Sequence, residues 1–343
     1  MQVKHQLPSL VEERTENSQI LSTVPIVVLH AHSSCNCRCV MCDIWKTRDQ
    51  KKIGVREIER QLESIRRLGV RWIVFSGGEP LMNSELPEIC ALLRAEGVRL
   101  TLLSTGLLLK KCADDVAENF DDVIVSLDGP REIHDGIRRV PGAFDLLLEG
   151  ICALRNKRPD IGITARSTVQ KANHCHLMET VKAAKDLQLD SISFLAVDMT
   201  STAFNRSLAW PLSRQTEIGL SLLELGVLEN EIERVIAASG RDCELGFVAE
   251  SPHKLRRIAH HFRAQLGLAA SESPLCNAPW VSAVIEADGS VRPCFFHPSI
   301  GNLSGTTLEA VINGAEGRGF RSTLDVASNP ICRNCVCSLN YRT

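Results

Sequence analysis

Apolar and polar positions follow two alternating periods through the first 200 residues. Short apolar runs predict buried strands at Ile26–Leu29, Trp72–Phe75, Leu100–Leu103, Val123–Leu127, Ile161–Val169 and Ile192–Val197. Stretches with helical spacing lie between them, most clearly at Val55–Leu68, which Gly69 follows in the position of a C-terminal cap. Strands that alternate with helices favour right-handed βαβ units around a parallel sheet. The pattern therefore predicts an α/β fold.

The pattern changes after residue 200. Residues 201–270 read mostly as helical, which is typical of a linker or a substrate-covering segment. Beyond them, Val281–Glu286 and Val291–Phe296 flank Asp288 and Gly289, a combination that predicts a β-hairpin. We expect short helices to follow at Thr307–Asn313 and Gly319–Leu324.

Composition and charge narrow the class of protein. The chain has 343 residues, of which 44% are hydrophobic and 23% charged, as in ordinary soluble globular proteins. The formal net charge of −2 gives no bulk attraction to nucleic acid or to an anionic membrane. No apolar run approaches the roughly 20 residues of a membrane span, and Met1–Asn17 does not resemble a signal peptide. We therefore expect a cytoplasmic protein with no nucleic-acid or membrane partner.

The placement of the cysteines is more informative than their number. The fourteen cysteines include two tight groups, formed by Cys35, Cys37, Cys39 and Cys42 and by Cys332, Cys335 and Cys337, with Cys276 and Cys294 ahead of the second group. Such clustering indicates metal ligation. The other five are scattered, and we expect buried structural thiols at Cys90, Cys112, Cys152, Cys175 and Cys243.

The first group supplies three thiolates from one loop directly after the first predicted strand. Cys35, Cys39 and Cys42 can hold three irons of a [4Fe–4S] cluster and leave the fourth iron open for a small chelating molecule. The alternative is a structural zinc site, which would need Cys37 as its fourth ligand within the same tight loop. In the cluster interpretation Cys37 is a bystander that points away, or an exposed thiol.

This spacing, placed after the first strand of an α/β domain, resembles the radical S-adenosylmethionine (SAM) superfamily. The segment Ser76–Pro80, with the sequence Ser-Gly-Gly-Glu-Pro after the second strand, looks like the glycine-rich motif of that family. The resemblance implies that this motif contacts the amino group of SAM. Glycines let backbone carbonyls approach a ligand closely, and a carboxylate adds charge for an ammonium group. The expected contacts are Gly77, Gly78, Glu79 and Pro80.

Polar residues also end the third, fourth and fifth predicted strands, at the rim where ligands of parallel sheets bind. Ser104 ends the third strand. By the same resemblance, Ser126 and Asp128 would lie near SAM, and Arg166 and Ser167 would bind its carboxylate. For each residue alone, a hydrogen-bonded strand-end side chain without a functional role is the alternative.

The resemblance also implies the fold and the chemistry. The core, expected over residues 24–200, would be a partial (β/α)6 barrel of the radical SAM type, preceded by an N-terminal extension over residues 1–23. SAM would chelate the open iron, and reductive cleavage would give a 5′-deoxyadenosyl radical that abstracts hydrogen from the substrate. The reducing partner would be a flavodoxin or a ferredoxin.

The second cysteine group resembles the twitch domain, the shorter relative of the SPASM domain. Cys276, Cys294, Cys332 and Cys335 would hold one auxiliary [4Fe–4S] cluster within a small α+β domain over residues 271–343, and Cys337 could replace Cys335. A CxxC-type zinc ribbon is the alternative. A cluster with four cysteine ligands suits a net oxidation, because it can carry an electron away from a substrate radical.

The substrate is the least determined part. The short N-terminal extension favours a small polar molecule of the sugar, nucleoside or aminocyclitol type, which would be oxidised or decarboxylated. A peptide maturase and a non-catalytic iron–sulfur or zinc protein are the alternatives. Asp198 and Arg206 follow the sixth strand and could act as catalytic base or substrate anchor, or could be ordinary loop residues.

Overall fold

The computed structural model describes residues 19–238 and 246–342, so the expected N-terminal extension lies mostly outside the described residues. Within them, nine strands form one sheet with the order β6-β5-β4-β3-β2-β1-β7-β8-β9. The strands are β1 (Ile26–His32), β2 (Trp72–Gly77), β3 (Arg99–Ser104), β4 (Asp122–Ser126), β5 (Gly162–Val169), β6 (Ser191–Ala196), β7 (Ser282–Ile285), β8 (Ser290–Arg292) and β9 (Gly301–Asn302). The six strands expected before residue 200 are confirmed, and they pair in parallel.

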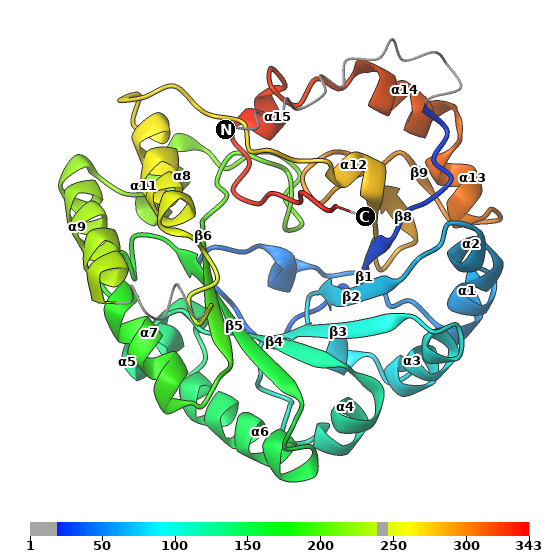
Figure 1. Ribbon diagram of the computed structural model, residues 1–343, viewed down its shortest axis with the longest axis horizontal. Coiled ribbons are helices and arrows are strands. Elements are labelled where there is room, and N and C mark those ends of the chain that lie inside the picture. The colour runs from blue at the N-terminus through cyan, green and yellow to red at the C-terminus, as the bar shows by residue number, and fades with distance from the viewer. Residues whose placement is uncertain (1–18, 239–245, 343) are drawn as a thin grey trace, which may run out of the picture.

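Helices alternate with these strands, as predicted for a mixed α/β fold. In chain order they are α1 (Val55–Glu59), α2 (Leu62–Arg67), α3 (Leu86–Ala95), α4 (Ala113–Asn119), α5 (Arg131–Arg138), α6 (Ala143–Lys157) and α7 (Leu177–Asp186). Short 3₁₀ turns lie at Ile44–Lys46 and Pro80–Met82. Figure 1 shows the sheet curved into an arc, with helices such as α3, α4 and α6 outside it and the C-terminal segment across its open side.

Burial along the strands explains this arrangement. In β5 every second residue is buried, including Ile163, Ala165 and Val169, which join the hydrophobic core. Because successive side chains of a strand point to opposite faces, Thr164 and Arg166 face the open inner side. Arg166 is exposed although it stands in the middle of a strand. The inner side of the arc is therefore polar and accessible.

The helix expected over Val55–Leu68 is interrupted between α1 and α2. The interruption coincides with Gln61, whose buried side chain donates to the carbonyl of Thr306 (3.2 Å) and accepts from the N–H of Leu308 (2.7 Å). Gln61 thereby caps α13 (Leu308–Ile312), a helix some 245 residues further along the chain. This contact joins the C-terminal segment to the core.

The region after β6 is mostly helical, as expected, with α8 (Leu212–Ile218), α9 (Leu222–Ala238) and α11 (Pro252–Gln265). The remaining helices are α12 (Ala278–Val281), α13, α14 (Ala315–Thr323) and α15 (Pro330–Arg333). The predicted hairpin is confirmed by the antiparallel pair β7 and β8. β7 also pairs in parallel with β1, so the C-terminal strands extend the main sheet. The domain boundaries at residues 200 and 271 stay predictions.

Two expectations about scattered thiols are wrong. Cys90 is fully buried, as expected, but Cys152 and Cys175 are exposed. Cys243 lies outside the described residues.

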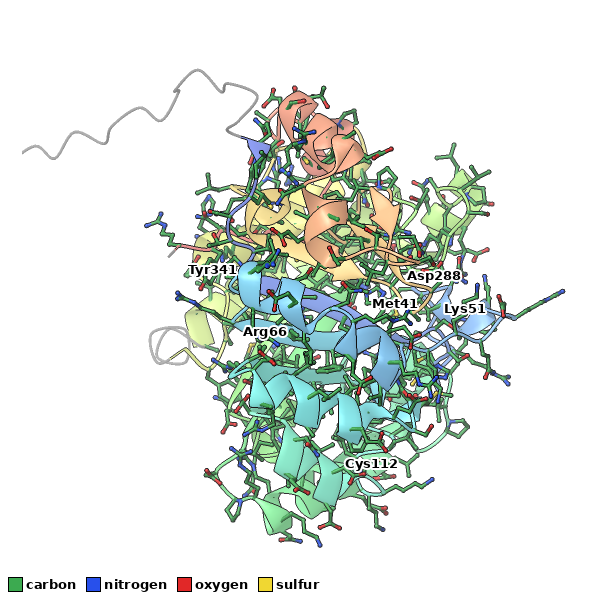
Figure 2. All side chains as sticks on the ribbon, turned by 90° about the vertical axis from the view of Figure 1, so that its right-hand side faces the viewer. Met41, Lys51, Arg66, Cys112, Asp288 and Tyr341 are labelled. Atoms are coloured by element: carbon green, nitrogen blue, oxygen red, sulfur yellow. The ribbon has the colours of Figure 1, made fainter. Side chains whose placement is uncertain are left out.

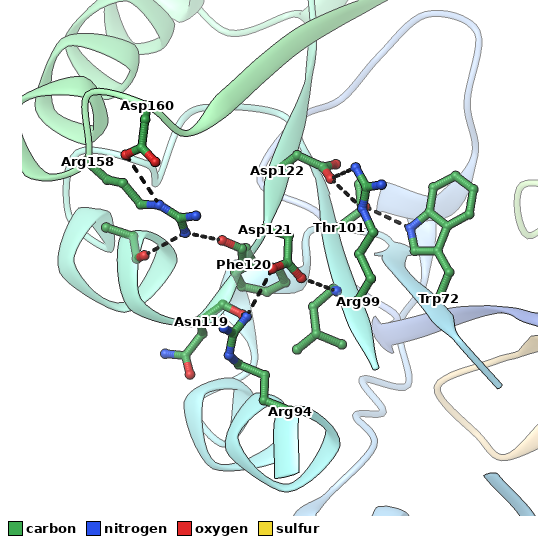
Figure 3. Close-up of polar contacts among 12 residues, drawn as sticks. Trp72, Arg94, Arg99, Thr101, Asn119, Phe120, Asp121, Asp122, Arg158 and Asp160 are labelled. Carbon is green, nitrogen blue, oxygen red and sulfur yellow. Dashed lines mark hydrogen bonds and ion pairs between the residues drawn. The ribbon is translucent and has the colours of Figure 1, made fainter. Parts of the chain in front are cut away.

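At the amino ends of the parallel strands, charged side chains are paired with one another or with the backbone (Figure 3). Asp121 accepts a hydrogen bond from the backbone N–H of Leu100 (2.7 Å) and pairs with Arg94 (3.4 Å). Arg99 donates to Asp122 on the neighbouring strand (3.0 Å). These contacts tie the beginnings of strands to the helices beside them.

Candidate functional site

The first cysteine loop leaves the carboxyl end of β1 and is fixed on two sides. On one side the backbone N–H groups of Arg38 and Val40 donate to the carbonyls of Arg138 and Ile137, both at 3.0 Å, at the end of α5. On the other side Arg206 donates to the carbonyl of Met41 (3.2 Å). The loop is therefore held in one conformation by segments far from it in the sequence.

Each of the three thiols expected to bind a cluster accepts one N–H hydrogen bond. The backbone N–H of Cys37 donates to Cys35 Sγ (3.5 Å), and that of Ile44 donates to Cys42 Sγ (3.4 Å). Arg138 Nη1 donates to Cys39 Sγ (3.5 Å). Hydrogen bonds to the ligand sulfurs stabilise thiolates and tune iron–sulfur clusters, so this donor set fits a cluster.

The protonation preferences of these thiols differ because their surroundings differ. A hydrogen bond from Cys37, opposed by burial and aided by Arg138, lowers the pKa of Cys39 to about 6. Burial and the neighbouring Cys39 raise the pKa of Cys42 to about 12. Cys37 itself is 1% exposed, so the alternative of a solvent-exposed thiol is wrong. Its hydrogen bonds to Cys35 and Cys39 raise its pKa, so Cys37 points toward these two thiols and not away from them.

The glycine-rich segment lies directly against the cysteine loop. The N–H groups of Gly78 and Glu79 donate to the carbonyls of His32 and Ser34, both at 2.9 Å. A Cβ atom on Gly78 would lie 1.9 Å from the carbonyl oxygen of Ser34, which no side chain could tolerate. Gly77 has φ of +108°, in the region that favours glycine. The two glycines are thus required for the contact between the two loops.

Glu79 is engaged within the chain rather than free for an ammonium group. Its carboxylate is fully buried and accepts hydrogen bonds from Ser104 Oγ (3.0 Å), from the N–H of Thr105 (2.7 Å) and from the N–H of Leu81 (3.2 Å). Ser104 is correspondingly occupied by Glu79. The structure therefore uses both residues to fix the loop to the end of β3, because each carboxylate oxygen already has partners. Pro80 is buried at the start of the 3₁₀ turn that follows.

Asp128 forms a buried ion pair with Arg138 (2.6 Å) and accepts a hydrogen bond from the N–H of Thr168 (2.9 Å). Although burial opposes the charge of Arg138, Asp128 and Cys39 raise its pKa. Asp128, Arg138 and Cys39 thus form one chain of contacts. Asp128 reaches the cysteine loop through Arg138, and its side chain is fully buried.

The other predicted SAM contacts lie on different faces of the sheet, some on the inner side and one on the buried outer side. Ser126 is partly exposed and lies opposite Arg166 in the register of β4 and β5, so these two face the inner side together. Ser167 points the other way and is fully buried, with an Oγ that has no hydrogen-bond partner among the described residues. Ser126 and Arg166 are therefore the predicted residues that a ligand on the inner side can reach.

A cavity of about 460 Å³ opens beside Gly77 and Gly78. His30 and His32 line it from β1, and Phe295 packs against His30 with ring centroids 5.6 Å apart. Lys51 and Asp288 also line it, and Figure 2 shows them on the same side of the molecule as Met41 of the cysteine loop. The cavity therefore lies where the two loops meet.

The two β1 histidines are not among the site residues predicted from the sequence, although both line this cavity. The spacing of two residues along a strand puts both on one face, and that signal could have found them. Burial, with a smaller effect of Arg292, lowers the pKa of His30 to about 4, which keeps its imidazole neutral. Its Nε2 has no hydrogen-bond partner within the described part of the chain.

Asp198 and Arg206 are not placed as a free base and anchor. Their side chains are 4% and 1% exposed and form an ion pair at 2.7 Å. Arg206 also stacks on Trp210, with its guanidinium carbon 3.8 Å from the ring centroid. Each charge is neutralised by the other. Because Arg206 also donates to the carbonyl of Met41, the pair holds the segment after β6 against the cysteine loop.

The second cysteine group comes together at the C-terminus. Burial raises the pKa of Cys294 and of Cys332 to about 11, and Cys276 adds to the effect at both. His297 Nε2 lies 3.3 Å from Cys332 Sγ. Among the described residues no three His, Cys, Asp or Glu side chains are gathered as a single metal ion would need. A four-iron cluster places its thiolates on separate irons, so its ligands need not meet at one point.

Comparison with known families identifies the core. Residues 32–195, which contain both loops and the carboxyl ends of β1 to β5, match the model of the radical SAM superfamily. The chain belongs to the radical SAM superfamily. Residues 276–336 match a second model, described as an iron–sulfur cluster-binding domain of the SPASM type. The two matches confirm the resemblance drawn from the cysteine spacing and imply a [4Fe–4S] cluster, an auxiliary cluster and SAM.

Radical SAM relatives match this chain over part of their length. Fe-coproporphyrin III synthase of Methanosarcina barkeri is 33% identical over 154 residues, which cover 43% of this chain and 38% of that protein. The probable GTP 3′,8-cyclase of Thermococcus kodakarensis is 30% identical over 210 residues, which cover 58% and 66%. The chain thus spans less than half of the first relative and just under two thirds of the second.

The fold is shared with solved radical SAM structures. SuiB of Streptococcus suis bound to S-adenosylmethionine superposes with a TM-score of 0.66 at 17% identity, over 94% of this chain and 75% of that chain. At this identity the likeness concerns the fold alone. No helix among the described residues is long and apolar enough to cross a membrane.

Proposed function

We propose that this radical SAM enzyme binds its [4Fe–4S] cluster on Cys35, Cys39 and Cys42 and acts on a small polar substrate, with net oxidation or decarboxylation. When bound and reduced, the cluster supplies the electron that cleaves SAM to the radical that abstracts hydrogen. The observation that carries the proposal is the set of three N–H donors, one aimed at each of these sulfurs. A flavodoxin or a ferredoxin is the proposed reductant.

The residues around the loop have separate tasks in this proposal. Gly77 and Gly78 present backbone carbonyls to the SAM amino group, while Ser126 and Arg166 reach the cofactor from the inner face. Glu79, Ser104 and Asp128, buried behind the rim, hold these groups in position, and Ser167 is buried beside them without a hydrogen bond from its Oγ among the described residues. Asp198 and Arg206 keep the cysteine loop in place from the other side, through the carbonyl of Met41.

We assign the auxiliary cluster to Cys276, Cys294, Cys332 and Cys335. It would accept an electron from the substrate radical, which fits an oxidation. The named relatives, a porphyrin synthase and a GTP cyclase, support a small-molecule substrate over a peptide, although each is matched over only part of its length.

The test measures the iron and sulfide content per chain after anaerobic reconstitution, together with the rate of SAM cleavage. The wild type should bind about eight irons, and the triple Ala variant of Cys35, Cys39 and Cys42 about four, with no SAM cleavage. A Cys332→Ala variant should also bind about four but should keep uncoupled cleavage. The buried core thiol Cys90 provides the control, because Cys90→Ala should change neither iron content nor cleavage.

Two results would contradict the assignment. An unchanged iron content in the triple variant would place the SAM cluster elsewhere. About four irons falling to none would mean that the C-terminal thiols hold no cluster, and the oxidation argument would fail with them.

A further inference from the structure

A second cavity, of about 160 Å³, lies on the inner side between β5, β6, α11 and the C-terminal segment. Arg166 lines it from β5, Lys254 and Arg257 from α11, and Arg333 from α15. Cys335 and Cys337 complete the wall. The cavity thus adjoins both the inner face near Ser126 and the second cysteine group.

The charge of this wall is strongly one-sided. Its four permanent cations face two carboxyl groups, those of Glu250 and Glu272. Glu250 accepts a hydrogen bond from the N–H of Phe194 (2.8 Å), and burial raises its pKa. The Glu272 side chain is 67% exposed and lies nearest to His260, at 3.6 Å. Glu250 interacts electrostatically with Arg166 and Lys254 and offsets part of their charge, but the four cations still outnumber the two carboxyl groups.

None of these four cations forms an ion pair with another described residue, whereas their neighbours on α11 do. Arg256 binds both oxygens of Glu233 (2.6 and 2.7 Å), and Arg263 pairs in the same way with Glu229. Arg257, next in the chain to Arg256, donates only to the carbonyl of Cys335 (3.4 Å). α11 therefore pairs its cations on one face and leaves them unpaired toward the cavity.

The remaining contacts of the cavity cations are to neutral groups. Arg166 donates to Ser193 Oγ (3.4 Å), and Arg333 donates to the carbonyl of Ser271 (3.2 Å). The side chain of Lys254 makes no ion pair or hydrogen bond with the described residues, although it interacts electrostatically with Glu250. Like charges gathered in a recess repel one another and concentrate a positive potential, which an anionic ligand would relieve.

We propose that Lys254, Arg257 and Arg333 in this cavity bind an acid group of the substrate, a carboxylate or a phosphate, while Arg166 at its edge faces SAM. The inference rests on the proposed function, because it places the substrate between the SAM-facing residues and the auxiliary thiols. The volume is below the ~300 Å³ typical of a whole ligand pocket, so it suits one acid group. Guanidinium groups bind such oxyanions through paired hydrogen bonds. The substrate is thus an organic acid or a phosphate ester whose remainder extends along the inner face.

The experiment measures anion binding to the reconstituted full-length protein with SAM present. Glutarate and inorganic phosphate serve as probes in calorimetric titrations at fixed ionic strength. Lys254→Gln should weaken binding of the preferred probe about tenfold, because it removes one charged hydrogen-bond donor and no hydrogen bond or ion pair within the described residues. Arg257→Lys should weaken probe binding less than Arg257→Gln, since lysine keeps the positive charge and loses only the paired N–H groups of the guanidinium. Arg318→Gln, an exposed cation on α14, is the matched control.

Preference for glutarate would identify a carboxylic acid substrate, and preference for phosphate a phosphate ester; either supports the proposal. Equal weakening by Lys254→Gln and Arg318→Gln would overturn it, because binding would then depend on overall charge. Wild-type protein that cleaves SAM but binds neither probe would also overturn it and leave the proposed function intact. A wild type without cluster or SAM cleavage would instead remove the proposed function.

Discussion

The two ends of the parallel strands are built on opposite principles. At the amino ends, the charged groups of Arg94, Arg99, Asp121 and Asp122 are paired with one another or with the backbone, and they lie near solvent (Figure 3). At the carboxyl ends, polar groups are buried, and His30 Nε2, on the wall of the larger cavity, has no hydrogen-bond partner among the described residues. A buried polar atom without a partner costs free energy, so the carboxyl ends keep groups that a ligand can satisfy.

The same contrast applies to the glycines at the two ends. Gly78 lies at the carboxyl end of β2, where any Cβ would collide with Ser34. Gly97 lies ahead of the amino end of β3 with φ of +75°, and a Cβ atom there would meet nothing within 4 Å. One glycine is required by a close approach of two loops and the other by a turn. Substitution of Gly78 should therefore disrupt the contact between the two loops, whereas substitution of Gly97 should affect only the backbone conformation of a turn.

Gly78→Ala should give the largest effect. The two loops must move apart, and we expect loss of SAM cleavage together with loss of the cluster at the first cysteine group. Gly97→Ala should cost only about 1 kcal/mol of unfolding free energy, from the left-handed backbone, and should keep SAM cleavage. SAM cleavage and iron content of the two variants test the contrast. Full cleavage by Gly78→Ala would show that the contact between the loops is dispensable.

Asp128→Asn should come next. It leaves the buried Arg138 without its carboxylate partner, and breaking a buried ion pair typically costs about 3–5 kcal/mol of unfolding free energy. Chemical denaturation of the reconstituted protein measures this loss. The double variant Asp128→Asn with Arg138→Met removes both charges and should recover part of the stability, although it also loses the donor to Cys39. A double variant less stable than the single one would mean that Arg138 is not stabilised by Asp128.

His134 makes the carboxyl end sensitive to pH. It is fully buried, its Nδ1 accepts a hydrogen bond from the N–H of Asp128 (3.2 Å), and burial, aided by Arg138, lowers its pKa to about 3. The unfolded chain, with an ordinary pKa near 6.5, therefore binds the proton more readily between these values. Stability is then unaffected above a pH of about 6.5 and falls as the pH decreases below it, by about 2 kcal/mol at pH 5.

His134→Asn keeps a hydrogen-bond acceptor without a titrating group. Denaturation at pH 7 and at pH 5 should show a smaller loss for this variant than for the wild type. His30 and His261, whose pKa values burial lowers to about 4, contribute equally to both proteins. An identical pH dependence in the two proteins would show that protonation of His134 does not cause the loss of stability at low pH.

Local features of the fold were predictable, and long-range ones were not. The six strands and the β7–β8 hairpin follow from runs and turns read within a few residues. The pairing of β7 with β1 and the capping of α13 by Gln61 join segments more than 200 residues apart, which no local pattern encodes. The interruption between α1 and α2 could not be predicted for the same reason.

The candidate site divides in the same way. Cys35, Cys39 and Cys42 lie on one loop, so their spacing alone indicates the chemistry. The engagement of Glu79 by Ser104 depends on β3, and the ion pair of Asp198 with Arg206 depends on how the segment after β6 packs. Sequence reasoning finds residues of the right chemical type and cannot tell which of them already have partners.

The smallest effect should come from the amino ends. Arg99 is 61% exposed and Asp122 19%, so water screens their ion pair, and Arg99→Ala should lower the unfolding free energy by about 0.2–1 kcal/mol. Because the pair is screened, the difference between Arg99→Ala and the wild type should shrink further as salt is raised from about 0.05 to about 0.5 M. SAM cleavage should be unchanged, since no residue of either loop contacts this pair. Denaturation at the two salt concentrations checks the prediction. A loss as large as that of Asp128→Asn would erase the distinction between the ends, because the amino ends would then depend on buried charge as well.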